Sequence, residues 1–229
     1  AFQEAPAVEL SQHVTKWSYQ IQNINEIDVV IDTAFKVANH GKKGAVHIDI
    51  PKCISSAKIA NNNEDTDIIQ LNSILPNLTE PLDTDISDEY LKQIAEVINK
   101  SQKPIIYLGQ GCIDSFKILR EFAKYNYIPV TSTIHGLGIY NDHEEYSLRW
   151  CGMHGLAGAN YALQEADCII ALGSRFDDRT TGNVSKYAPK ARENKSIIHV
   201  NIEPSEINKV IETDYNVVGD CGIFIENIM

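Results

Sequence analysis

The chain has 229 residues, 43% of them hydrophobic, a size that allows one large or two modest globular domains. No run approaches the roughly 18 consecutive apolar residues of a membrane-spanning helix, and the net charge of −11 disfavours nucleic acid as the main partner. Five widely spaced cysteines predict neither a disulfide framework nor a zinc cluster, which favours a reducing compartment.

The N-terminal segment predicts part of an α/β domain. It starts without a methionine and without the pattern of a signal peptide, so a fragment or a processed form is expected. Helical spacing of apolar residues predicts a helix over Glu26–Asn39, and Ala45–Ile50 predicts a strand that Pro51 ends. Residues 58–85 are polar, contain prolines and lack periodicity, which predicts a linker. We therefore expect a partial domain over 1–57 and a second domain over 86–229.

The second domain alternates between helical and strand patterns. Helices are predicted after the N-cap Ser87, over Ser115–Tyr125 and His154–Glu165, at Pro204-Ser205 and at the C-terminal end. Strands are predicted over Pro104–Leu108, Ile128–Ser132, Cys168–Leu172, Ser196–Ile202 and Asn216–Val218. Because these strands are apolar on both faces, they predict a parallel sheet covered on both sides. The expected fold class is α/β, a doubly wound parallel sheet of five or six strands.

Glycines and polar residues follow the predicted strands, at the edge where such sheets bind ligands. The strand ends read GQG at 109–111, TST at 131–133, GSR at 173–175, NIE at 201–203 and GD at 219–220. A further glycine-rich stretch, CGMHGLAGAN at 151–160, precedes or opens a helix. Glycines let a ligand approach backbone N–H groups, and arginine contacts phosphate in a bidentate manner. Together these features predict a site for a long dinucleotide.

Each element also has a simpler interpretation. GQG often forms only a tight turn, and Asp114 stands where the dinucleotide fingerprint has its third glycine. His154 can cap a helix, and RFDDR at 175–179 can be an exposed loop held by ion pairs. Asp177 and Asp178 make a poor catalytic pair, because neighbours in an extended chain point to opposite sides. No function is assigned to His13, His40 and His47, and neither catalytic residues nor metal ligands are predicted in this chain.

The ordered motifs closely resemble one family. "GMHGLAGANYALQEADCIIALGSRFDDRTTGNVSKYAP" resembles the central region of the acetolactate (acetohydroxyacid) synthase catalytic subunit, a thiamine-diphosphate enzyme, and "AFQE", "GKKGAVHIDIPK" and "IPVTSTIHGLGIY" resemble it in the same order. The resemblance implies that 1–57 ends a pyrimidine-binding domain and that 86–229 is an FAD-binding, Rossmann-like central domain. It implies an activating glutamate before Ala1 and a magnesium and diphosphate motif beyond Met229, so this fragment alone is expected to be inactive.

The same resemblance implies the function and partners of the full-length enzyme. That enzyme condenses pyruvate with pyruvate or 2-oxobutyrate, with decarboxylation, in branched-chain amino-acid biosynthesis, and uses thiamine diphosphate, Mg²⁺ and a structural FAD. A homodimer or homotetramer is expected, with a regulatory subunit as a further candidate partner. The compartment implied is the mitochondrion or plastid in a eukaryote and otherwise the cytoplasm.

Position by position, the resemblance also implies which residues contact the flavin. The isoalloxazine and ribityl contacts correspond to Thr133, Ile134, His135, Gly152, Met153 and His154. The diphosphate contacts correspond to Gly109, Gln110, Gly111, Gly173, Ser174, Arg175, Asp177 and Arg179. The adenosine contacts correspond to Asn201, Ile202, Gly219, Asp220 and Cys221. Phe2 and Gln3 match residues near the thiamine and substrate channel of a neighbouring subunit.

Two departures from the family pattern motivate an alternative. Gln12 stands where many members have an arginine that contacts FAD, and Asn201 stands where an acidic residue often holds the adenosine ribose. The second change replaces a charge-assisted hydrogen bond by a neutral one, roughly half as strong. One alternative is therefore a non-catalytic scaffold with a decayed flavin site. The other is a different FAD-carrying thiamine-diphosphate enzyme such as glyoxylate carboligase, although the extended RFDDRxTGN motif favours acetolactate synthase.

Overall fold

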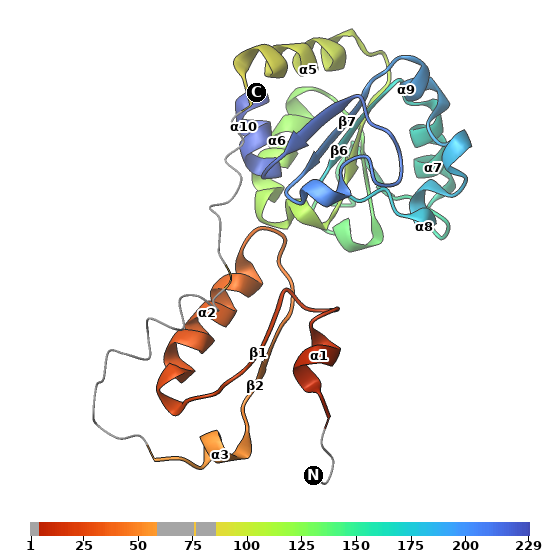
Figure 1. Ribbon diagram of the computed structural model, residues 1–229. Coiled ribbons are helices and arrows are strands. Elements are labelled where there is room, and N and C mark those ends of the chain that lie inside the picture. The colour runs from red at the N-terminus through yellow and green to blue at the C-terminus, as the bar shows by residue number, and fades with distance from the viewer. Residues whose placement is uncertain (1–4, 59–75, 77–85) are drawn as a thin grey trace. The chain divides into compact units, whose positions relative to one another are not determined.

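A computed structural model describes residues 5–58, 76 and 86–229, which form two compact units, Ala1–Pro81 and Leu82–Met229 (Figure 1). The predicted linker 58–85 lies, apart from Lys58 and Pro76, outside the described residues, and so do Phe2 and Gln3. The proposed domain boundaries therefore stay a prediction. Among the described residues, no helix is both long and apolar enough to span a bilayer.

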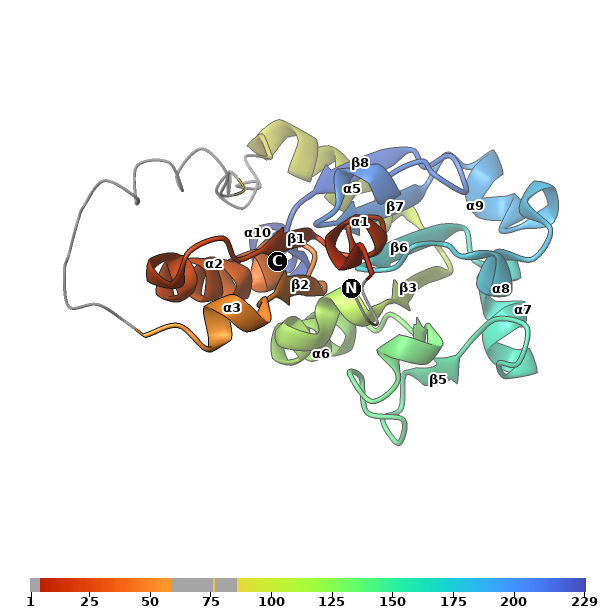
Figure 2. The ribbon, with the colours of Figure 1, turned by 60° about the horizontal axis from the view of Figure 1, so that its bottom comes forward.

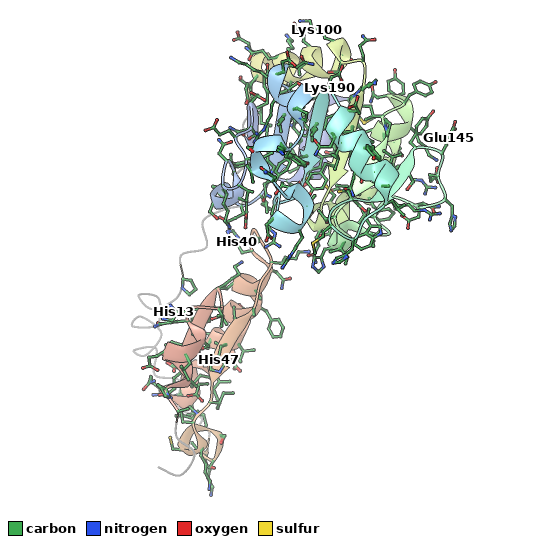
Figure 3. All side chains as sticks on the ribbon, turned by 90° about the vertical axis from the view of Figure 1, so that its right-hand side faces the viewer. His13, His40, His47, Lys100, Glu145 and Lys190 are labelled. Atoms are coloured by element: carbon green, nitrogen blue, oxygen red, sulfur yellow. The ribbon has the colours of Figure 1, made fainter. Side chains whose placement is uncertain are left out.

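The N-terminal unit contains a short parallel pair of strands and a helix packed on it. Its elements are α1 (Ala7–Ser11), β1 (Trp17–Gln20), η1 (Ile24–Glu26), α2 (Ile27–Asn39), β2 (Val46–Asp49) and α3 (Lys52–Ser55). The predicted helix and strand correspond to α2 and β2, whereas β1, which pairs with β2 in parallel register, was not predicted. Figure 3 shows His13, His40 and His47 at separate places in this unit. Within the described residues no three His, Cys, Asp or Glu side chains are grouped as a metal site would require.

The C-terminal unit contains a six-stranded sheet in which every strand pairs in parallel. Its strands are β3 (Pro104–Leu108), β4 (Val130–Ser132), β5 (Ser147–Trp150), β6 (Cys168–Leu172), β7 (Ile197–Asn201) and β8 (Tyr215–Val218). The order across the sheet is β5-β4-β3-β6-β7-β8 (Figure 2). This is the order of a doubly wound sheet, so the predicted fold class is confirmed.

Helices cover both faces of the sheet because successive strand residues point to opposite sides. The helices are α5 (Asp88–Lys100), α6 (Phe116–Tyr125), α7 (Ala157–Glu165), α8 (Asp178–Thr181), α9 (Pro189–Glu193) and α10 (Cys221–Ile228). On β3, Ile106 and Leu108 pack with buried residues of α5, α6 and α10. Ile105 and Tyr107 pack instead with buried residues of α7 and α9. The unit therefore has two hydrophobic cores, one on each side of the sheet.

Several element boundaries differ from the predicted ones. The predicted helix over Ser115–Tyr125 is the 3₁₀ helix η2 (Gln110–Ser115) followed by α6, and the predicted helix at Pro204-Ser205 is the 3₁₀ helix η5 (Pro204–Glu206). Two further 3₁₀ helices are η3 (Ile134–Gly136) and η4 (Val184–Lys186). The helix predicted from His154 begins only at Ala157, because Leu156 is in an extended conformation.

Candidate functional site

The topology places a switch point between β3 and β6. These strands are neighbours, yet β4 and β5 follow β3 on one side while β7 and β8 follow β6 on the other. In open α/β sheets, chain segments leaving such a point in opposite directions open a crevice outside the carboxyl ends of the strands. The turns after β3 and β6 therefore mark the candidate site.

Backbone hydrogen bonds align the strand ends in one continuous edge. The N–H groups just past the strands donate to carbonyls at the ends of neighbouring strands, over 2.8–3.0 Å. The pairs are Thr133 to Leu108, Gly109 to Leu172, Gly173 to Val200 and Gly219 to Asn201. The sheet edge thus brings together the glycine turns that the sequence predicts to act together.

The glycine turns at the switch point approach each other too closely for any side chain. Gly111 N–H donates to the Gly173 carbonyl over 3.1 Å. A Cβ atom on Gly109 would lie 2.1 Å from the Gly173 carbonyl oxygen, and one on Gly173 would lie 2.6 Å from the Gly111 Cα. Gly173 also has a φ of +59°, which favours glycine. The two turns pack backbone against backbone, and together we call them the glycine cradle (109–111 and 173–174).

Ser174 adds a polar group to this cradle. Its side chain is buried, and its hydroxyl has no hydrogen-bond partner among the described residues. Buried hydroxyls in native proteins are nearly always paired. An unpaired hydroxyl beside a glycine cradle is therefore the feature expected where a polar ligand binds.

The charged residues of the RFDDR motif follow directly. Asp177 caps the short helix α8, because its carboxylate accepts from Arg179 N–H over 3.1 Å. The side chains of Arg175 and Arg179 are exposed, and neither guanidinium forms an ion pair with another described residue. The simpler interpretation of RFDDR as an ion-paired loop therefore finds no support.

The residues predicted for the isoalloxazine end lie at the tips of β4 and β5. Thr133 is buried and accepts from Gly136 N–H through its side chain over 3.1 Å, which fixes the turn after β4. Ile134 and Met153 are about 58% and 60% exposed. Met153 N–H donates to the Arg179 carbonyl over 2.7 Å, so this turn is bonded to α8. Two apolar side chains therefore stand at the sheet edge without cover from the described part of the chain.

At the other end of the edge, several predicted contact residues are occupied within the chain. Asn201 is buried, and its amide donates to the Ser174 carbonyl over 2.8 Å while its oxygen accepts from Glu203 N–H over 3.0 Å. Asp220 caps α10 by accepting from Gly222 N–H over 2.7 Å. Cys221 is buried in the core. These side chains hold the fold, so only the backbone of this turn is free to meet a ligand.

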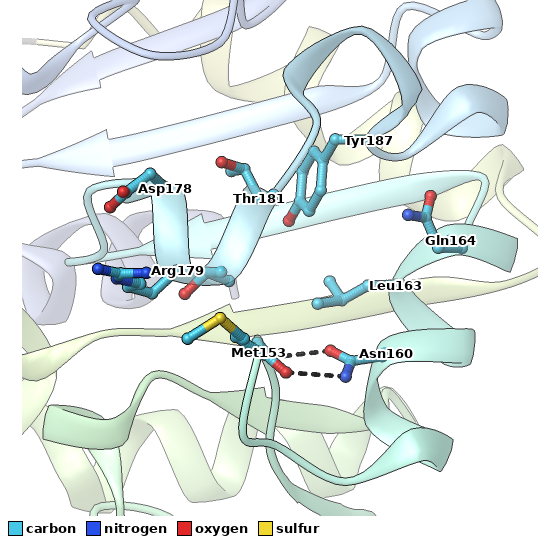
Figure 4. Close-up of a pocket in the computed structure, with 11 residues that line it drawn as sticks. Met153, Asn160, Leu163, Gln164, Asp178, Arg179, Thr181 and Tyr187 are labelled. Atoms are coloured by element: carbon cyan, nitrogen blue, oxygen red, sulfur yellow. Dashed lines mark hydrogen bonds between the residues drawn. The ribbon is translucent and has the colours of Figure 1, made fainter.

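A pocket that the sequence did not predict adjoins the glycine-rich turn at 151–155. It has a volume of about 290 Å³ and lies between α7 and α8 (Figure 4). The Asn160 side chain pairs with both Gly152 N–H and the Gly152 carbonyl, over 2.8 and 2.9 Å, and so holds the turn to α7. Tyr187 reaches the pocket from the far side, and its buried hydroxyl has no partner among the described residues. Burial raises the pKa of Tyr187 well above its usual value, so this hydroxyl stays protonated.

The sequence carried only weak signals for these supporting residues. Asn160 lies in the helical pattern and gives no sign that its amide pairs with a glycine eight residues earlier. His199 lies within an apolar strand pattern, where a buried histidine looks like any core position. The Asn160 side chain bonds to the backbone of Gly152, and the His199 ring bonds to the carbonyl of Ser174. The sequence alone does not show such side-chain-to-backbone pairs.

Comparisons with known proteins give a consistent picture. The family model described as the thiamine pyrophosphate enzyme, central domain, matches residues 91–228. The mitochondrial acetolactate synthase catalytic subunit of Saccharomyces cerevisiae is 40% identical over 242 residues, which cover 100% of this chain and 34% of that protein. The chloroplastic acetolactate synthase of Arabidopsis thaliana is 36% identical over 228 residues, covering 100% of this chain and 32% of that protein. The chain thus spans about one third of the length of the relatives that it matches.

Proposed function

Because the chain belongs to the thiamine pyrophosphate enzyme family and carries its central domain, we propose that it is part of an acetolactate synthase catalytic subunit whose residues 86–229 hold FAD. The full-length protein would condense two 2-oxoacids, pyruvate with pyruvate or with 2-oxobutyrate, and release carbon dioxide. The similarity to acetolactate synthases over the whole chain supports this proposal.

One observation carries the flavin part of the proposal. At the switch point the glycine cradle carries no side chains at residues 109, 111 and 173, and the unpaired Ser174 hydroxyl lies within it. A flat, doubly phosphorylated ligand matches these groups, because phosphates accept hydrogen bonds from backbone N–H groups, hydroxyls and guanidinium groups. These groups support the proposal that the described residues hold FAD.

We assign roles to the chain's own residues accordingly. The cradle and the Ser174 hydroxyl would bind the diphosphate, and Arg175 and Arg179 would neutralise its charge. Ile134 and Met153, the exposed apolar residues at the tips of β4 and β5, would pack on the isoalloxazine ring and exclude water from it. When bound, FAD supplies a structural element rather than a redox step in the main reaction, as the family resemblance implies. Its removal should therefore affect the shape of the site.

The remaining partners are proposed for the whole protein. Thiamine diphosphate and Mg²⁺ would serve the full-length enzyme, which would act as a homodimer or homotetramer. The named relatives are mitochondrial or chloroplastic proteins, and we propose the corresponding organelle for this one.

The test uses the full-length protein purified without added flavin. We expect absorbance bands of bound flavin and formation of 2-acetolactate from pyruvate. Arg175→Gln should weaken FAD binding about tenfold or more, because a charge-assisted contact to phosphate is lost. Arg192→Gln is the matched control. Arg192 lies on α9, which leads into the amino end of β7 and so away from the cradle, and FAD affinity should not change.

The outcomes separate the proposal from its rivals. A flavoprotein that consumes glyoxylate and not pyruvate would favour a carboligase of the glyoxylate type. A protein that binds no flavin at any concentration would favour the scaffold alternative. Equal losses in Arg175→Gln and Arg192→Gln would contradict the assignment of the diphosphate to the cradle.

A further inference from the structure

The carbonyl of Ser174 receives two side-chain donors from β7. His199 Nε2 lies 2.9 Å from this oxygen and Asn201 Nδ2 lies 2.8 Å from it. The two residues are two apart on a strand, so their side chains share one face. Backbone pairing between β6 and β7 ends at Leu172 and Val200. The side chains of β7 therefore continue the attachment of the β6 segment beyond the end of the backbone ladder.

The donor on His199 is defined by its partner. A carbonyl oxygen can only accept, so the Nε2 atom carries the proton, and Nδ1 has no partner among the described residues. The ring is completely buried, and this burial lowers the pKa of His199, which keeps the ring neutral. With two lone pairs and two donors, the Ser174 carbonyl is saturated.

A second anchor follows on the other side of Arg175. Phe176 is buried, with 2% of its surface exposed, although it has a left-handed φ of +52°. Its ring packs edge-on against His199, with ring centroids 5.0 Å apart, and against Tyr107 at 5.3 Å. Arg175 itself is exposed. The backbone of Arg175 is thus held on one side by the doubly hydrogen-bonded carbonyl of Ser174 and on the other by the buried ring of Phe176.

We propose that His199 and Asn201 are positioning residues for Arg175, which act through the Ser174 carbonyl and aim the guanidinium at the diphosphate of the cofactor. This inference rests on the proposed function, because Arg175 is the residue assigned there to FAD. It also changes the role of Asn201. The resemblance implied a contact with the adenosine ribose, whereas both polar atoms of the amide are used within the chain.

The test is a double-mutant cycle in the full-length protein. His199→Phe keeps a ring against Phe176 but removes the donor, and His199→Gln restores an N–H group at about the same reach. FAD affinity is measured by quenching of flavin fluorescence on titration into the apoprotein, and stability by the midpoint of thermal unfolding. We expect His199→Phe to weaken FAD binding about tenfold, the scale of one lost hydrogen bond, and His199→Gln to recover most of the loss.

The decisive comparison is in the Arg175→Ala background. If His199 acts through Arg175, then His199→Phe should change FAD affinity there by less than twofold, while its effect on the melting temperature stays the same in both backgrounds. Ile198→Val, on the opposite face of β7, is the control for stability alone. It should lower the melting temperature and leave FAD affinity unchanged. If His199→Phe does not fold, Asn201→Ala replaces it in the same cycle, since it removes the other donor.

Three results would overturn the inference. One is an undiminished loss of FAD affinity when Arg175 is already alanine. Another is a folded His199→Phe protein with unchanged FAD affinity. The third is an unsubstituted protein that binds no FAD, which would remove the proposed function and this inference with it. The first two leave the proposed function intact, so the two failures are distinguishable.

Discussion

At the scale of single residues, glycines at two kinds of position allow a controlled comparison. Gly173 and Gly182 both have a positive φ, +59° and +57°, and Gly182 combines it with a ψ of −119°, outside the left-handed helical region. A Cβ on Gly173 would meet the Gly111 backbone at 2.6 Å, whereas nothing lies within 4 Å of one on Gly182. A substitution at Gly182 therefore adds backbone strain alone, whereas one at Gly173 also adds a clash between the two turns.

We predict that Gly182→Ala costs about 1–3 kcal/mol of unfolding free energy, because essentially only glycine adopts its combination of φ and ψ. Gly173→Ala should cost a similar strain plus about 1–3 kcal/mol for overpacking of the cradle, and it should also weaken FAD binding. Urea denaturation of both variants measures the difference. Equal losses of stability would mean that the two turns of the cradle can move apart at no cost in free energy, and would contradict the predicted clash.

The buried thiols make a second prediction at this scale, on pH. Burial raises the pKa of Cys151 to about 11 and that of Cys168 to about 12, from an ordinary value of 9.0. Above pH 9 the unfolded chain releases these protons while the folded chain keeps them. Below pH 9 the free energy of unfolding therefore does not depend on these thiols. As the pH rises above 9 toward 11, it falls by about 1.4 kcal/mol per pH unit for each thiol.

Denaturation curves between pH 8 and pH 10.5 test this dependence. The Cys168→Ala variant should be less stable at pH 8, because a buried side chain is truncated, but its stability should fall less steeply above pH 9. An identical slope in both proteins would show that Cys168 does not titrate between the folded and unfolded states as its burial requires.

The roles of residues whose side chains bond to distant parts of the chain could not be predicted from the sequence. The glycines and arginines of the candidate site were predicted because they follow apolar strand patterns, and the carboxyl ends of parallel strands meet at one edge. Asn201 was assigned to the adenosine end by the family resemblance, and nothing in the sequence shows that its amide bonds to Ser174, 27 residues earlier. For the same reason, the supporting roles of His199 and Asn160 were not predicted.

At the scale of elements, the buried strands and the edge strands β2 and β8 were predicted, whereas β1 and β5 were not. β3, β6 and β7 are runs of aliphatic residues because helices cover both faces of them. β1 (WSYQ) and β5 (SLRW) lack such runs, since β5 lies at the edge of the sheet and β1 belongs to a two-stranded pair. Their pairing comes from the neighbouring strand rather than from their own pattern, and for this reason local periodicity missed both.

Helix starts depended on local capping, which the sequence revealed in part. Ser87 was predicted as the N-cap of α5, and its hydroxyl accepts from Tyr90 N–H over 3.3 Å. α7 begins later than predicted because the preceding turn folds back. Gly155 N–H bonds to the Gly152 carbonyl over 3.0 Å, and Leu156 N–H bonds to the Trp150 carbonyl over 3.0 Å. These local bonds within the turn thus override the helical pattern that starts at His154.

At the scale of the whole molecule, each unit has a core of its own. The cores on the two faces of the large sheet are built from residues 86–228, and the small core around Ile21 and Val30 from residues 17–54. A segment that buries its apolar surface within itself can fold independently. The predicted boundary at residue 86 therefore implies that the segment after it is stable on its own, which an experiment can test.

We predict that residues 86–229 fold cooperatively when they are expressed alone. Within this segment, Ile86 packs against the core, Ser87 caps α5, and the Tyr90 hydroxyl accepts from Asn216 N–H over 2.9 Å. Circular dichroism during urea denaturation should give one transition. A matched segment that starts at Pro104 lacks α5 and with it the buried Leu91, Ile94 and Ile98. Since each such side chain contributes about 1.5–3 kcal/mol, the shorter segment should be largely unfolded. Two equally folded segments would show that α5 is dispensable, and two unfolded ones would place the true boundary before residue 86.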